Sequence, residues 1–93
     1  METDRFIELC TDAVVSYFNS QADSTDKNGL ITPDDVFVVW CCKTLQNNKA
    51  LLSTRVPDGM YYEVTYDYHK GCYYLDAYKK FENRCIWCNE IRK

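Results

Sequence analysis

The sequence contains few of the residues that build linkers and catalytic sites. Its 93 residues include three glycines, two prolines and a single histidine. So few glycines and prolines leave little room for long linkers, and a chain of this length is expected to fold as one domain, residues 1–93. Any Cys–His or Ser–His catalytic pair would have to use His69, and no glycine-rich phosphate loop is present. These absences predict a single-domain protein that is not an enzyme.

A signal peptide and a membrane-spanning run are also missing from the sequence. The first residues are acidic, without the basic start and apolar core of a secretory signal. No apolar stretch approaches the ~20 residues needed to cross a bilayer. We therefore expect a soluble, cytosolic protein that does not bind membranes. In that reducing compartment the cysteines are expected to be free thiols or metal ligands; they are Cys10, Cys41, Cys42, Cys72, Cys85 and Cys88.

The chain is rich in apolar and aromatic residues, and its charge is unevenly placed. Hydrophobic residues make up 46% and aromatic residues 15%, which indicates a folded globule. Residues 1–35 hold eight acids and two bases, whereas residues 36–93 hold nine bases and six acids. An acidic region on a mildly basic body could steer a partner. The simpler interpretation is a solvated helix face followed by an acidic loop.

Residues 4–19 have the periodicity of an amphipathic helix. Their apolar positions recur at steps of three and four and so share one helix face; they are Phe6, Leu9, Cys10, Ala13, Val14, Tyr17 and Phe18. Thr3 is the predicted N-cap, and a polar loop over residues 20–28 is expected to follow.

The next segment combines a helix start with the composition of a strand. Thr32 and Pro33, followed by two acids, predict a short helical turn. Residues 36–42 are β-branched, aromatic or cysteine on both faces, as in a fully buried strand. We therefore expect one helical turn that leads into a central strand over residues 36–45.

Three further strands are expected, separated by turns. Asn47 and Asn48 suit a tight hairpin turn, and residues 57–59 (Pro-Asp-Gly) form a strong turn signal. The strands are predicted over residues 49–56, 60–68 and 72–78. Together the elements predict an α+β fold, with the N-terminal helix packed on a four-stranded antiparallel meander. Residues 79–93 are ambiguous and could form a short C-terminal helix or a last strand.

Seven of the eight tyrosines lie between residues 61 and 78, around a turn at residues 69–71. Because side chains alternate along a strand, one set should face the helix; it comprises Tyr62, Tyr66, Tyr68 and Tyr73. The remaining tyrosines are expected at the surface, where tyrosine and tryptophan often anchor binding partners. The predicted partner-binding residues are Tyr61, Tyr74, Tyr78 and Trp87.

One set of residues has the spacing of a structural zinc site. His69 and Cys72 form one pair and Cys85 and Cys88 a second, twelve residues further on. A strand over residues 72–78, however, would carry the chain roughly 20 Å away from the first pair. The alternative is that the cysteines behave as small hydrophobic residues. The second pair also has a dithiol spacing, without the strand–helix context of a redox site.

Two other ligand types were weighed against simpler interpretations. Residues 24–35 overlay a calcium-binding EF-hand loop, with Ser24 and Asp35 in positions that normally hold aspartate and glutamate. An ordinary polar turn fits this segment better. A tyrosine-rich sheet could also stack nucleic-acid bases, but the pI is near 5.0 and no basic run borders the sheet. Direct nucleic-acid binding is therefore not expected.

Four segments resemble a small family of unknown function that occurs in phages and prophages of Gram-positive bacteria. They are residues 34–40 (DDVFVVW), 43–51 (KTLQNNKAL), 58–66 (DGMYYEVTY) and 74–83 (YLDAYKKFEN). The resemblance covers most of the chain. It implies a phage-encoded protein that acts in the host cytoplasm, and it implies no activity and no site residues.

The leading hypothesis is a non-enzymatic phage accessory protein that binds a host protein. Inhibition of an antiviral defence system such as CRISPR is one specific form, in which the acidic first third would mimic nucleic-acid phosphate. One alternative is a zinc-stabilised nucleic-acid-binding module. Another is a protein that sequesters a nucleotide signal by stacking its base on the aromatic residues. A homodimer is compatible with each of these.

Overall fold

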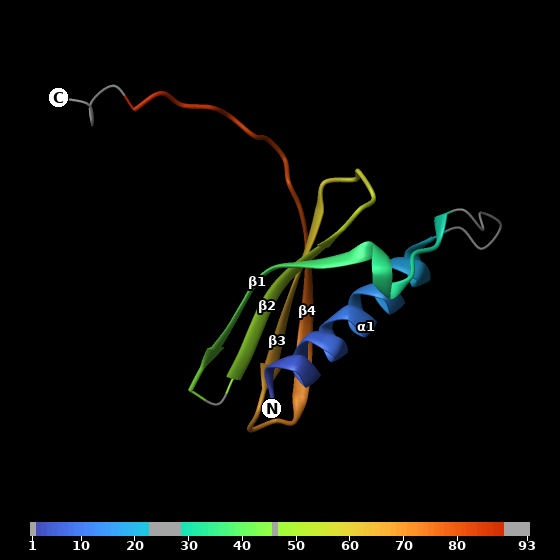
Figure 1. Ribbon diagram of the computed structural model, residues 1–93, viewed down its shortest axis with the longest axis vertical. Helices are drawn as coiled ribbons and strands as arrows, with labels where there is room; N and C mark the ends of the chain where they lie inside the picture. The colour runs from blue at the N-terminus through green and yellow to red at the C-terminus, as the bar shows by residue number, and fades with distance from the viewer. Residues whose placement is uncertain (1, 23–28, 46, 89–93) are drawn as a thin grey trace.

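The structure, a computed structural model, describes residues 2–22, 29–45 and 47–88. In chain order the elements are α1 (Thr3–Gln21), a 3-10 turn η2 (Pro33–Asp35), β1 (Val36–Thr44), β2 (Asn47–Thr54), β3 (Met60–Asp67) and β4 (Cys72–Lys79). The strands form one antiparallel sheet in the order β1-β2-β3-β4, and α1 lies against one of its faces (Figure 1). The predicted α+β fold is confirmed. Among the described residues, no helix combines the length and apolar character needed to cross a membrane.

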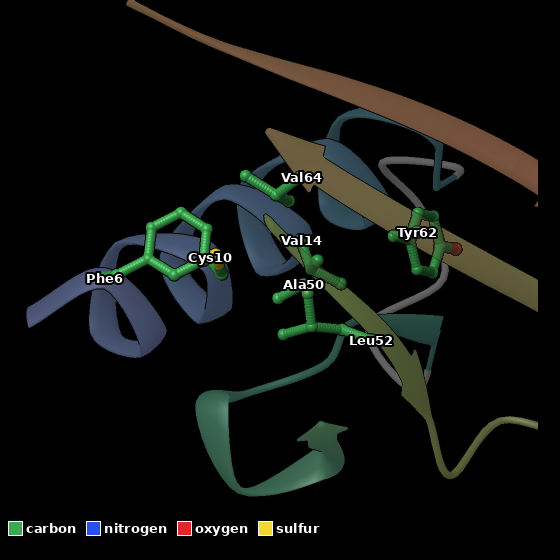
Figure 2. Packing of buried hydrophobic residues seen from close by; sticks show 7 residues of the cluster. All are labelled: Phe6, Cys10, Val14, Ala50, Leu52, Tyr62 and Val64. Atoms are coloured by element: carbon green, nitrogen blue, oxygen red, sulfur yellow. The ribbon is translucent and has the colours of Figure 1, made fainter. Parts of the chain in front are cut away.

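The core forms where one stripe of α1 meets the two middle strands. Figure 2 shows side chains from α1 directed at side chains from β2 and β3. The cluster consists of Phe6, Cys10, Val14, Ala50, Leu52, Tyr62 and Val64, each at most 2% exposed. The Tyr17 ring meets the Tyr62 ring edge-on, with centroids 5.9 Å apart. Complete burial of each large aliphatic or aromatic side chain stabilises the fold by about 1.5–3 kcal/mol.

The N-terminal cap of α1 is a different residue from the predicted one. The N-cap is Glu2, which makes no side-chain capping bond, and Thr3 is already helical. The prediction of Thr3 as N-cap is therefore wrong. Asp4 in the first turn still complements the positive end of the helix dipole.

A side-chain clamp connects the end of α1 to the chain that enters the sheet. The Asn19 side chain donates to the Ile31 carbonyl oxygen (3.0 Å) and accepts from the Ile31 N–H (2.9 Å). At the next residue, the Thr32 N–H donates to the Asp35 carboxylate (2.9 Å). The predicted helical turn before the first strand is confirmed. Because both contacts lie just before β1, they fix where that strand begins.

The prediction that residues 36–45 form a buried central strand is wrong. β1 is an edge strand, and most of its large side chains are exposed. An irregularity in its pairing at Val39 puts an extra residue into the strand. As a result Trp40 lies opposite Leu51, on the face away from α1, whereas Cys41 lies opposite the buried Ala50. β1 carries apolar side chains on both faces of the sheet, and most of them are exposed and not buried.

Two of the four tyrosines predicted to face α1 are not buried under it. Tyr62 is buried and Tyr66 packs against the core, as expected. Tyr68, however, follows the last residue of β3 and is 55% exposed, so the prediction that it faces α1 is wrong. Tyr73 is 46% exposed. Tyr73 does lie on the helix side, opposite Tyr66 in the register. An open hollow between α1 and Tyr73, lined also by Leu9 and Ala13, leaves this ring only partly covered.

The turns follow the sequence signals at two of three places. Asn47 and Asn48 are part of β2, so the predicted turn at these residues is wrong. The chain turns earlier, at Leu45, which has a φ of 55°. Glycines with positive φ occupy the other two turns, at Gly59 and Gly71.

The described chain after β4, residues 80–88, has no regular structure. The Lys80 N–H donates to the Gly59 carbonyl oxygen (2.7 Å), and beyond this bond the chain leads away from the sheet (Figure 1). Residues 80–88, which we call the C-terminal arm, form neither helix nor strand and are exposed throughout. The expected C-terminal helix or strand is therefore wrong for these residues. Residues 89–93 lie outside the described part of the chain.

Candidate protein-binding surface

The sheet face opposite α1, here called the outer face, carries an aromatic surface. The strand register places these side chains together, because directly paired residues point to the same side. Trp40 is paired with Leu51, Tyr61 with Tyr78, and Thr65 with Tyr74. The surface spans all four strands and consists of Phe37, Trp40, Leu51, Tyr61, Tyr74 and Tyr78.

Most of these side chains are half-exposed. Trp40 is 41% exposed, Phe37 and Tyr74 are each 47% exposed, and Tyr78 is 52% exposed. A shallow hollow is lined by four apolar or aromatic residues and three charged ones, namely Trp40, Leu51, Tyr61, Tyr78, Glu63, Lys79 and Lys80. Side chains held on a paired sheet lose little conformational freedom on binding, which favours their use as anchors.

An acidic pair lies beside the aromatic surface. Glu63 on β3 and Asp76 on β4 are directly opposite each other, an arrangement in which like charges repel. The Lys49 ammonium lies 3.7 Å from Glu63, and no basic group of the described residues forms an ion pair with Asp76. The middle of the outer face therefore favours a cation.

One aromatic side chain of the outer face is oriented by a neighbour. The Lys70 ammonium donates to the Tyr74 hydroxyl at 3.5 Å. This contact raises the pKa of Lys70, and the same contact holds Tyr74 at the end of β4 nearest the hairpin turn.

Three of the four predicted anchors lie on this face. Tyr61, Tyr74 and Tyr78 are brought together there, whereas Trp87 is on the C-terminal arm and is 77% exposed. Sequence reasoning missed Phe37 and Trp40. Both lie in the apolar run over residues 36–42, whose composition predicts a buried strand and therefore gives no sign that Phe37 and Trp40 are exposed.

The structure does not bring the four predicted zinc ligands together. His69 and the nearby Cys72 lie at the turn between β3 and β4, with the His69 ring edge-on to Tyr68. Cys85 and Cys88 are on the arm, which leaves from the opposite end of β4. Within the described ranges, no three His, Cys, Asp or Glu side chains gather as a metal site would require.

The predicted calcium loop lies mostly outside the described residues. Ser24, Asp26 and Asn28 belong to the segment that the structure does not describe. Asp35, the last proposed ligand, uses its carboxylate to accept the Thr32 N–H. That role fits the polar-turn interpretation.

All six cysteines are free thiols, and they differ in burial and therefore in reactivity. Burial, followed by the charge of Cys41, raises the pKa of Cys10 to about 12. Burial and the charge of Cys42 also raise the pKa of Cys41. A buried thiol with a raised pKa is a poor nucleophile, so Cys10 acts as part of the core.

No curated protein and no solved structure matches this chain. A match to a described protein family covers residues 7–88, which is most of the sequence and includes most of α1 and the whole sheet. The chain therefore belongs to the family of unknown function DUF6275.

Proposed function

We propose that this protein is a non-enzymatic accessory protein that acts by binding another protein through the outer face of its sheet. The observation that carries the proposal is the aromatic surface that spans all four strands. Glu63 and Asp76 separate Tyr74 from the Tyr61–Tyr78 pair, so the surface offers aromatic anchors on both sides of an acidic pair. Aromatic residues dominate the binding energy of many interfaces.

The charges of the outer face support a protein partner over a nucleic acid. Phosphate would meet Glu63 and Asp76, which repel it. An arginine or lysine of a partner would instead neutralise this pair and lie beside aromatic rings, where a cation is also attracted. The partner surface that fits is apolar, with one basic side chain near its centre.

The resemblance to phage and prophage proteins supports a more specific form of the proposal. A phage protein of this size would act in the host cytoplasm on a host protein. Inhibition of an antiviral defence system is one such action, and the exposed acids of α1 could take part in it by mimicking phosphate. Asp4, Glu8 and Asp12 recur every four residues and so form one stripe on α1, on the other side of the molecule from the outer face.

Neighbouring tyrosines on β4 provide a matched test. Tyr74 is on the outer face and is 47% exposed, while Tyr73 is on the helix side and is 46% exposed. Tagged wild-type protein, Tyr74→Ser and Tyr73→Ser would each be used to recover partners from a Gram-positive bacterial lysate. The recovered partner would then be purified and its affinity for all three proteins measured by calorimetry.

We expect Tyr74→Ser to weaken binding by about tenfold or more, the effect of an interface anchor, and Tyr73→Ser to have little effect. Asp76→Asn should also weaken binding to a partner that presents a cation. Equal losses in Tyr73→Ser and Tyr74→Ser would contradict a role for the outer face. Failure of wild-type protein to bind any purified partner would overturn the proposed function itself.

A further inference from the structure

β1 has the composition of a central strand but lies at an edge of the sheet. It pairs only with β2, so its other edge presents backbone N–H and C=O groups that have no strand partner in the described chain. Natural edge strands are usually protected by charged side chains, and β4 at the opposite edge carries Asp76 and Lys79. Residues 36–42 of β1 hold no charge, so the protection of this stretch of the edge is limited to the irregularity at Val39. This edge is a template for a further strand.

The C-terminal arm has the properties of a strand that lacks a neighbour. Residues 80–88 continue directly from β4 and pair with no strand of the described chain. The Arg84 guanidinium and the Glu82 carboxylate are 2.7 Å apart, as expected where residues two apart point to one side of an extended chain. Phe81 and Trp87 then share the other side.

The apolar side chains of the arm contribute almost nothing to the fold of the single chain. Phe81 is 98% exposed, and Ile86 and Trp87 are each 77% exposed. Ordering an extended segment with three large exposed apolar side chains is unfavourable in water, because their surface stays in contact with solvent. The segment therefore requires a surface to cover it.

The arm of one chain cannot easily reach its own β1 edge. β1 and β4 are the two outer strands, three inter-strand spacings apart, so the arm would have to cross about 14 Å of sheet before pairing could begin. The arm instead leads away from the sheet beyond the Lys80–Gly59 bond (Figure 1). A second copy offers the same edge without this crossing.

We propose that the C-terminal arm of one copy adds as a fifth strand to the free edge of β1 in a second copy, and that two copies exchange arms reciprocally. The exchange satisfies the backbone groups of the β1 edge and covers Phe81, Ile86 and Trp87. It makes β1 a central strand, which is the position that its composition predicts. Each copy carries one arm and one free β1 edge, so reciprocal exchange closes as a two-fold dimer. This inference does not depend on the proposed function, which uses the outer face.

Three variants test this contact, two of them in the arm and one in the β1 edge. A chain that ends at Lys80 removes the arm but keeps the Lys80–Gly59 bond; Phe81→Ser/Ile86→Ser/Trp87→Ser removes only its apolar side chains. Val39→Lys charges the β1 edge at a side chain that is 45% exposed and is not part of the aromatic surface. Sedimentation equilibrium would give the mass of each protein over a range of concentrations, and circular dichroism would verify that each variant is folded.

We expect wild-type protein to be a dimer and all three variants to be monomers at the concentrations where wild type is dimeric. A mixture of the arm-less chain with the β1-edge variant should regain a heterodimer, because one supplies the edge and the other the arm. A monomeric wild type would overturn the proposal. So would an arm-less chain that remains dimeric, since that result would indicate direct pairing of β1 with β1. Larger arm-dependent assemblies would overturn the closed exchange.

Discussion

At the scale of single residues, burial decides which cysteines can react. Cys10 is completely buried and its pKa is raised to about 12, whereas Cys42, Cys85 and Cys88 are exposed. Thiol reagents attack the thiolate, so both access and ionisation are denied to Cys10.

We therefore predict two classes of thiol in an alkylation experiment at pH 8. Cys42, which lies on the outer face, should be labelled rapidly by iodoacetamide, while Cys10 should be labelled only as the protein unfolds. Mass spectrometry of digested samples taken over time distinguishes the sites. Protein unfolded in guanidinium, in which all six cysteines should react at similar rates, is the control. Rapid labelling of Cys10 in the folded protein would contradict the packing of α1 on the sheet.

The same buried thiol predicts a loss of stability at high pH. Because the folded-state pKa of Cys10 lies above its ordinary value of 9.0, the unfolded state loses this proton first as the pH rises. The stabilising contribution is complete below pH 9 and is lost between pH 9 and about 12, at up to about 1.4 kcal/mol per pH unit. Tyr62, whose pKa is raised by burial, then by Asp58 and Tyr17, adds to the loss above pH 10.

Urea unfolding at pH 8, 9, 10 and 11 measures this dependence. Cys10→Ala should be less stable at pH 8 but should lose less stability on going to pH 10, since it has no thiol to ionise. Parallel curves for the two proteins would exclude Cys10 as the source of the dependence.

At the scale of elements, the turn between β1 and β2 contains a residue that does not suit its backbone. Leu45 has a φ of 55°, in the left-handed region, and its side chain is 93% exposed. A side chain with Cβ in this conformation costs about 1–2 kcal/mol, and asparagine tolerates it better than leucine does.

We predict that Leu45→Asn stabilises the protein by about 1 kcal/mol, because the strain falls and no buried contact is lost. A thermal melt should show a rise of about 4–8 °C for a domain of this size. Leu45→Ala removes the exposed side chain but keeps a Cβ, so it should leave the melting temperature nearly unchanged. Equal stabilisation by both substitutions would mean that the exposed leucine itself, not the backbone, is unfavourable.

The elements also show which parts of this fold the sequence could predict. The positions of α1 and the strands could be predicted from the periodicity of apolar side chains, which is a local property of the sequence. The edge position of β1 does not, because an apolar run has the same composition whether a second strand, a ligand or a partner covers it. Likewise the exposure of Tyr73 depends on how much of the sheet one helix covers.

The candidate binding surface was predictable in part for the same reason. Alternation along β3 and β4 correctly separated Tyr61, Tyr74 and Tyr78 from Tyr62. Trp40 escaped because the irregularity at Val39 moves it to the outer face, and a strand pattern without a regular period does not signal such a shift. The four predicted zinc ligands do not converge, because β4 separates the His69–Cys72 pair from the Cys85–Cys88 pair. The length of the predicted strand already indicated this separation.

At the scale of the whole molecule, arm exchange would tie stability to protein concentration. Only folded chains can exchange arms in register, so dimer formation draws the equilibrium toward the folded state. The melting temperature of wild-type protein should therefore rise by several degrees with each tenfold increase in concentration. The chain that ends at Lys80 should melt at a temperature independent of concentration. A constant melting temperature for both would argue against exchange.

The order of the strands has a consequence for how the protein folds. Each strand pairs with the next one in the chain, so the sheet can assemble through contacts between near neighbours. Phe6, Cys10 and Val14, in contrast, meet partners that lie far along the sequence. Because local contacts form before distant ones, the β2–β3 hairpin is expected to be structured in the transition state and α1 to dock after it.

Stopped-flow kinetics on two core substitutions would test that order. Leu52→Ala, in β2, should mainly slow folding, whereas Val14→Ala, in α1, should mainly speed unfolding. The reverse pattern would mean that helix docking nucleates the sheet. If the hairpin does fold first, a chain emerging from the ribosome must complete β3 before the apolar stripe of its first helix has anything to pack against. The apolar stripe of α1 would then stay exposed to solvent while the ribosome synthesises the rest of the sheet.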